Sequence, residues 1–219
     1  MSSSEINTEA ESLKVIRGKY KDEFRKGTPI VVACEKGRLD DLILFVKLYI
    51  KESNNKTLPP VKSWLEQIGT TSNGTYEINT LMAAAMYEHE NVLKKLLDYG
   101  VDPSIIDDEG DNALHMSAYY NKTSTGCTES LLKKMTLESI NQKNYGGRTP
   151  LDEAYLNKNQ IIQNKLIPLI IKYRGISNFP NRNGVNGDLN RDNNTDGNGE
   201  TEWYIDHIDH IKENPTLKF

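Results

Sequence analysis

The side chains that could perform chemistry lie mainly near the end of the sequence. His207 and His210 stand three residues apart, and each follows an aspartate, so a single helical turn could bring them to a metal ion. Two histidines in one short segment are a weak ligand set, and we expect no metal there. The sequence contains no nucleophile with a partner base, no glycine-rich phosphate loop and no paired metal-binding cysteines. These residues therefore predict neither an enzyme nor a cofactor.

A second acidic pattern begins like a calcium-binding loop. In residues 192–197, acidic and amide side chains alternate before Gly197. A calcium loop requires a bidentate glutamate at its twelfth position, and Trp203 occupies that place. No helical pattern precedes the loop. We therefore expect no calcium site.

The stretch from Leu96 to Ala118 contains the clearest structural pattern. It reads LLDYGVDPSIIDDEGDNALHMSA: an apolar helix ends, an Asp-Pro turn and an Asp-x-x-Gly tip follow, and a Leu-His pair opens a second helix. Gly100 and Gly110 supply positive φ where the helix stops and where the finger between the helices reverses. The pattern resembles the ankyrin repeat, whose Thr-Pro-Leu-His-x-Ala signature recurs about every 33 residues.

The leading apolar residue of this signature recurs four times. It is Ile30, Leu81, Leu114 and Leu151, at intervals of 51, 33 and 37 residues by subtraction. Each copy is followed by a second apolar helix, predicted at residues 39–50, 91–99, 129–135 and 159–173. Pro168 is expected to kink the last of these, because proline removes a backbone donor.

The resemblance implies an all-α solenoid of about four helix pairs, in which stacking of neighbours creates the core. Short finger loops join the pairs, and a long insertion separates the first two. Within that insertion, a possible helix at 61–68 carries Trp64. The insertion is either an exposed loop or part of a binding surface. The expected segments are a disordered start (1–8), a capping helix (9–26), the repeats (27–174, with the insertion at 51–77), an Asn/Gly/Asp-rich linker (175–202) and an acidic aromatic segment (203–219).

Composition and charge indicate the cellular compartment and the classes of partner to expect. The 219 residues carry a net charge of −4, and the excess of acidic side chains falls after Gly175. The repeats are neutral overall, which does not favour nucleic acid as a partner. No apolar run is long enough to span a membrane, no signal peptide is evident, and two cysteines offer no disulfide framework. We expect a monomer in a reducing cytoplasmic or nuclear setting.

Proteins that resemble this one bind partners on a concave surface made of finger tips and first helices. Carried onto this sequence, the resemblance implies contacts at Tyr76, Glu77, Met86, Tyr87, Asp108, Glu109, Asp111, Tyr119, Tyr120, Asn144, Tyr145, Arg148 and Tyr155. His115 belongs to the signature and is expected to have a structural role, whereas His89 is expected to be exposed in a loop. A separate docking segment is predicted from bulky residues beyond the linker: Trp203, Tyr204, Ile205, Ile208 and Ile211.

Two functions follow from this pattern. The first is a noncatalytic adaptor that recognises another protein, of unknown identity, by its concave surface. The second is a dedicated chaperone or assembly factor that shields a basic client with the acidic residues between Glu200 and Glu213. Whether the docking segment binds its own repeats or another protein stays open at this point.

Overall fold

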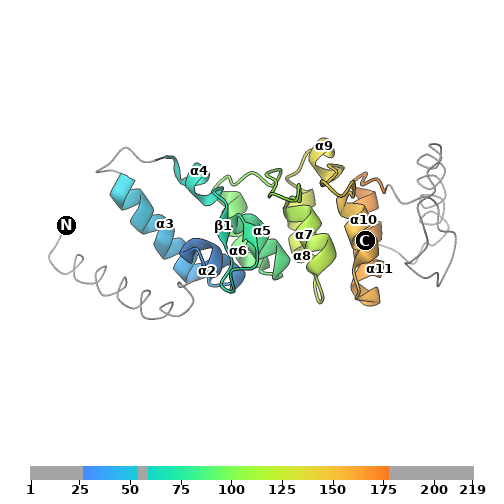
Figure 1. Cartoon of the computed structure of the whole chain (residues 1–219), viewed down its shortest axis with the longest axis horizontal. Coiled ribbons are helices and arrows are strands. Elements are labelled where there is room, and N and C mark those ends of the chain that lie inside the picture. Colours follow the sequence, from blue (N-terminus) through green and yellow to red (C-terminus); the bar gives the residue numbers. More distant parts are fainter. Residues whose placement is uncertain (1–26, 54–58, 178–219) are drawn as a thin grey trace.

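The computed structural model describes residues 27–53 and 59–177. Helices follow one another in pairs, and Figure 1 shows the pairs side by side in chain order. The four pairs are α2 (Pro29–Glu35) with α3 (Leu39–Ser53), α5 (Thr80–Met86) with α6 (Glu90–Asp98), α7 (Ala113–Tyr120) with α8 (Gly126–Leu132), and α10 (Pro150–Leu156) with α11 (Gln160–Lys172). The predicted helix pairs are confirmed.

The pairs form two layers. The first helices α2, α5, α7 and α10 pack against one another in a row, and the second helices α3, α6, α8 and α11 form the row behind them. The leading apolar residues lie between the layers, where Leu81, Leu114 and Leu151 are fully buried and Ile30 nearly so. The small side chains of residues 83–85 are also fully buried, which lets neighbouring helices approach closely.

The first helices begin at side chains that satisfy their free backbone N–H groups. Asn79, Asn112 and Thr149 each accept a hydrogen bond from the first turn of α5, α7 and α10, respectively. At α7 and α10 the third helical residue bonds back to the capping residue, which completes a capping box. The repeat signature therefore fixes the start of these helices as well as their buried face.

The insertion contributes a short helix and a pair of strands. Helix α4 (Val61–Leu65) is shorter than the predicted 61–68, and Trp64 stacks on Tyr49 of α3 with ring centroids 4.2 Å apart. Strand β1 (Gly69–Thr70) then pairs antiparallel with β2 (Glu77–Ile78). The finger between the first two pairs is thus a small hairpin, a local addition to the all-α fold. Trp64 serves here as a packing residue.

Some element boundaries differ from the predictions. The second helix of the third pair spans Gly126–Leu132 rather than 129–135, and a further helix, α9 (Leu137–Ile140), occupies a segment that was expected to be loop. Thr136 caps α9 by accepting the N–H of Ser139. Helix α11 continues through Pro168 to Lys172. The missing proline donor is therefore tolerated within this helix.

The prediction that His89 is exposed is wrong. Its ring is half-buried, and Nε2 lies 2.8 Å from the carbonyl oxygen of Glu35 in the preceding repeat. Within the described residues, none of the helices is long and apolar enough to cross a bilayer. The predictions for residues 1–8, the capping helix at 9–26, most of the linker at 175–202 and the docking segment at 203–219 fall outside the described residues.

Candidate protein-binding surface

Three tyrosines from two repeats meet at the exposed side of the first-helix row. Tyr119 and Tyr120 end α7, and Tyr76 precedes strand β2 in the neighbouring finger. The Tyr120 ring makes edge contacts with Tyr119, at 4.8 Å between centroids, and with Tyr76, at 6.3 Å. Its hydroxyl donates to the Tyr76 hydroxyl over 3.4 Å. We call these residues the tyrosine cluster. Burial and the Tyr76 contact raise the pKa of Tyr120, so the phenol stays neutral.

The finger between the second and third helix pairs is held by Asp107. Its Oδ1 accepts the backbone N–H groups of Glu109, at 3.0 Å, and Asp111, at 2.9 Å. Gly110 supplies the positive φ at the tip, as the sequence predicts. Burial, with a smaller effect of neighbouring Asp111 and Asp108, raises the pKa of Asp107 to about 6. The finger therefore presents several carboxylates on a rigid backbone.

The next finger is joined to this one by Asn144. Its Nδ2 donates to Asp111 Oδ1 at 2.7 Å and to Glu153 Oε1 at 3.1 Å, and its Oδ1 accepts the N–H of Arg148. The Arg148 Nε donates to Glu153 Oε1 at 2.6 Å. The backbone N–H of Tyr145 also donates to the Glu109 carbonyl at 2.9 Å. These bonds hold the two fingers and α10 as one unit.

His115 has the structural role that the repeat signature implies. Its Nε2 lies 3.1 Å from the Arg148 carbonyl, and the N–H of Asn112 donates to Nδ1. The proton must therefore be on Nε2, because the other nitrogen accepts. Burial lowers the pKa of His115 to about 4, which keeps the ring neutral at pH 7. The buried neutral ring connects α7 to the following finger.

Two adjoining hollows lie along the fingers. One, of about 280 Å³, is bounded by the first two fingers and Tyr120, and the other, of about 320 Å³, lies between Tyr119, Arg148 and the same finger carboxylates. Glu109, Asp111, Met116 and Tyr120 line both hollows. We call them together the finger groove. It combines carboxylates with aromatic rings, and Arg148 is already paired with Glu153.

Eight of the thirteen residues predicted to contact a partner line the finger groove: Tyr76, Glu77, Asp108, Glu109, Asp111, Tyr119, Tyr120 and Arg148. Tyr145 is 74% exposed beside it, while Tyr87 and Tyr155 lie elsewhere. Met86 and Asn144 are 7% and 6% exposed, so the expectation that they are available to a partner is wrong. Met86 packs in the core, and the Asn144 amide donates hydrogen bonds to Asp111 and Glu153 within the protein.

Met116 and Glu153 are not among the predicted contacts, yet both border the groove with 5% and 4% of their surface exposed. Each stands two residues after the leading apolar residue of its repeat, Leu114 or Leu151. The signal that could have found them is therefore the repeat register itself. The register applies only to α7 and α10, because the equivalent residues of the first two helices, Val32 and Ala83, are fully buried.

The described residues contain no group of three or more His, Cys, Asp or Glu side chains suited to hold a metal ion. Cys34 and Cys127 are buried and unbridged, and burial raises the pKa of Cys127 to about 12. Since the thiolate is the reactive form of cysteine, this thiol is unreactive near pH 7.

A comparison with protein-family models matches residues 81–175 to "Ankyrin repeats (3 copies)". This part of the chain consists of ankyrin repeats. The match covers the last three helix pairs, and the structure adds α2 and α3 as a further pair stacked on α5 and α6. Ankyrin repeats are in general modules for interaction between proteins, so this coarse function applies to the chain.

A curated relative supports the same family. The human "SH3 and multiple ankyrin repeat domains protein 2" is 33% identical over 114 residues. These residues are 50% of this chain but only 6% of that protein, so the similarity covers a small part of the relative. The similarity supports an interaction module and gives no particular partner.

Proposed function

We propose that this protein is a noncatalytic adaptor that binds a segment of a partner protein in the finger groove. The observation that carries the proposal is the tyrosine cluster, in which rings from two repeats meet beside the hollows along the fingers. Tyrosine buries a large area with little loss of side-chain freedom and keeps a polar end for hydrogen bonds. Such residues frequently dominate the energy of interfaces.

The charges around the cluster favour a partner segment with lysine or arginine. Glu77, Asp108 and Glu109 are exposed at the groove. Arg148 lines the groove and is paired with Glu153, so its positive charge is largely neutralised. The finger carboxylates therefore make the local electrostatic potential negative. A basic partner segment would be attracted by these carboxylates, and this attraction would weaken as salt rises.

The proposal is tested by comparing partners captured by variants of the full chain. Tyr119→Ala combined with Glu109→Lys should remove partners that the unchanged protein retains, because it removes an aromatic contact and reverses a charge. Lys165→Ala, at an exposed position of α11, is the matched control and should retain them. Equal capture by the groove variant, at unchanged thermal stability, would contradict the adaptor proposal.

A second candidate is a chaperone for a basic client, favoured by the same carboxylates together with the acidic residues between Glu200 and Glu213. It differs in predicting one stoichiometric client whose binding depends on those later residues. Replacing Glu200, Glu202 and Glu213 by Gln should then weaken capture several-fold at low salt. If capture depends on the groove variant alone, the adaptor function is favoured.

A further inference from the structure

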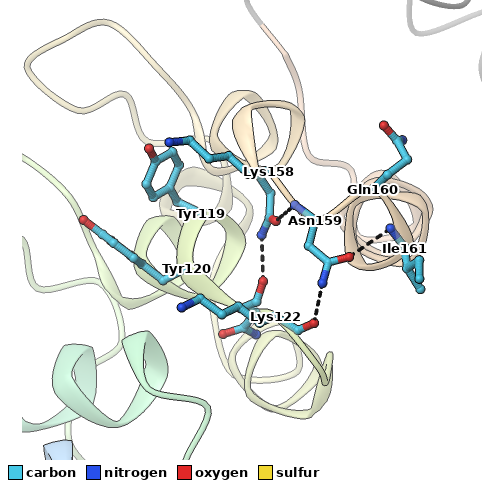
Figure 2. A pocket seen from close by; sticks show the side chains of 9 residues that line it. Tyr119, Tyr120, Lys122, Lys158, Asn159, Gln160 and Ile161 are labelled. Atoms are coloured by element: carbon cyan, nitrogen blue, oxygen red, sulfur yellow. Dashed lines mark hydrogen bonds between the residues drawn. The ribbon is translucent and has the colours of Figure 1, made fainter.

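A third hollow lies at the opposite ends of the first helices from the fingers. It has a volume of about 760 Å³ and is formed by the loop from α7 to α8 and the loop from α10 to α11. We call it the loop hollow. Tyr119 and Tyr120 line it on one side, Lys122 and Lys158 come from the two loops, and Ile161 lies at the start of α11 (Figure 2).

Hydrogen bonds between repeats keep the walls of the loop hollow in place. The Asn157 Nδ2 donates to the carbonyls of Ala118 and Asn121, both at 2.9 Å. The Asn159 Nδ2 donates to the Lys122 carbonyl at 2.8 Å, and its Oδ1 accepts the N–H of Ile161 (Figure 2). Because the two loops are bonded to each other, the hollow does not require an occupant to form.

Several groups at the loop hollow have no counterpart within the described part of the chain. Ile161 is 71% exposed and gives the loop hollow an apolar side chain at its edge. Neither the Lys122 nor the Lys158 ammonium is ion-paired with a carboxylate of residues 27–53 or 59–177. The Oδ1 of Asn121 is buried and accepts no hydrogen bond there. Because Asn121 Oδ1 has almost no accessible surface, only the lysines and Ile161 can select a ligand, and the matching ligand is acidic and partly apolar.

The sequence contains a segment with this chemistry. Residues 202–211 read EWYIDHIDHI, with three carboxylates among five aromatic or aliphatic side chains. We propose that the loop hollow binds this segment of the same chain, with its carboxylates at Lys122 and Lys158 and its bulky side chains against the tyrosines and Ile161. This inference concerns a different occupant from the proposed partner and does not rest on the proposed function.

The connection is long enough for binding within one chain. The described residues end beside the start of α10, where Thr149 Oγ1 donates to the Ile176 carbonyl. The loop hollow lies at the other end of α10, a helix of seven residues and therefore about 10 Å long. The 25 residues from 178 to 202 can extend to roughly 80 Å. The segment from 178 to 202 is therefore long enough for residues 202–211 to contact the loop hollow.

Occupation of the loop hollow would also affect the finger groove. Tyr119 and Tyr120 line both surfaces. A segment that covers these rings from the loop side restricts the area left for a partner. If the proposed function holds, the acidic segment would compete with the partner for the surface of these two tyrosines.

Carbodiimide cross-linking of the full chain at low micromolar concentration tests the contact directly. We expect amide links from Lys122 or Lys158 to Asp206 or Asp209, identified by mass spectrometry, and formed within single chains when heavy- and light-isotope proteins are mixed. Lys165 of α11 serves as an internal control and should form at least five-fold fewer links to these aspartates. Links found only between chains, or equal links from Lys165, overturn the proposal.

A charge exchange sharpens the test. Lys158→Glu removes the amine and therefore any amide link from position 158 to either aspartate, and adding Asp209→Lys should restore a link between these two positions, now with its acid and amine exchanged. In a separate measurement, Trp203→Ser with Ile205→Ser should speed hydrogen exchange of residues 157–161 at least three-fold. Leu217→Ser is the matched control and should leave it unchanged. No restored link, or no effect of the first pair on exchange, overturns the proposal.

Discussion

The two edges of the first-helix row differ in charge and in the way they are held together. At the finger edge, carboxylates predominate, Asp107 holds the backbone of one finger, and Asn144 connects that finger to the next. At the loop edge, Lys122 and Lys158 flank a hollow, and asparagine amides bond to backbone carbonyls. The loop edge is not purely basic, since the Glu88 carboxylate accepts the backbone N–H groups of Lys122 and Thr123. The same repeated unit therefore produces edges that differ in side chains and bonding, because its signature constrains the buried face and leaves finger and loop side chains free to differ.

Among the variants that compare the two edges, Asn112→Ala at the finger edge should lower the free energy of unfolding the most. The Asn112 side chain is fully buried, accepts the N–H groups of Leu114 and His115, and donates to the Ser139 carbonyl. Loss of the cap and of a buried hydrogen bond should lower the free energy of unfolding by about 3 kcal/mol. Urea denaturation measures it, with exposed Asn91→Ala as control. A loss below 1 kcal/mol would show that the cap is dispensable.

At the loop edge, Asn157→Ala should have the next largest effect. It leaves the carbonyls of Ala118 and Asn121 without their amide donor. We expect the free energy of unfolding to fall by about 2 kcal/mol, less than at Asn112 because no helix cap is lost. The same urea experiment checks it, and Lys158→Ala is the neighbouring control. An effect larger than that of Asn112→Ala would reverse the ranking of the two edges.

The pH dependence of stability should distinguish the edges through Asp107. Its pKa rises from 3.8 to about 6 in the folded protein, so the native state binds more protons than the unfolded state between these values. Ionisation of the Asp107 carboxyl therefore destabilises the folded protein. The free energy of unfolding falls as pH rises from about 4 to 6 and stays lower above pH 6.

Asp107→Asn keeps an acceptor for the two finger N–H groups and removes this cost. At pH 7.5 it should be more stable than the unchanged protein by about 1 kcal/mol, reduced from the full linkage value by residual solvation. The gain should disappear near pH 4. Thermal unfolding of both proteins across this range measures the difference in stability. His115, whose lowered pKa changes stability with pH in the opposite direction, is present in both proteins, so its contribution cancels. A gain that does not vary with pH would contradict the assignment to this carboxyl.

The smallest effect on stability is expected from Lys122→Ala with Lys158→Ala. Both side chains are exposed, and neither is ion-paired within the described ranges, so the free energy of unfolding should change by less than about 0.5 kcal/mol. The variant separates binding at the loop edge from folding. A loss of more than 1 kcal/mol in urea denaturation would indicate that these lysines are structural.

Much of the fold was predictable from spacing. The recurrence at Ile30, Leu81, Leu114 and Leu151 gave the four helix pairs, and all four residues are buried. The boundaries of α8 and the existence of α9 were not predictable in this way. Short helices depend on capping and on neighbouring contacts more than on apolar periodicity.

The candidate surface was predictable as a region but not residue by residue. The register placed Tyr119 and Tyr120 at the end of a first helix, where both line the groove. The same reasoning placed Met86 and Asn144 on the surface, although both are buried. Whether a side chain near a helix end or finger is exposed depends on the neighbouring repeat that covers it.

The sequence by itself determined the stacking unit: which residues are apolar at helical spacing, where helices begin, and where a glycine permits a finger to turn. Only the tertiary structure decided that Tyr76 meets Tyr120 across 44 residues, that carboxylates gather along the finger groove, and that Lys122 and Lys158 meet at the loop hollow. The physical reason is that periodicity and capping act over one or two turns of chain. Contacts between repeats depend instead on how closely whole helices pack and on the loops between them.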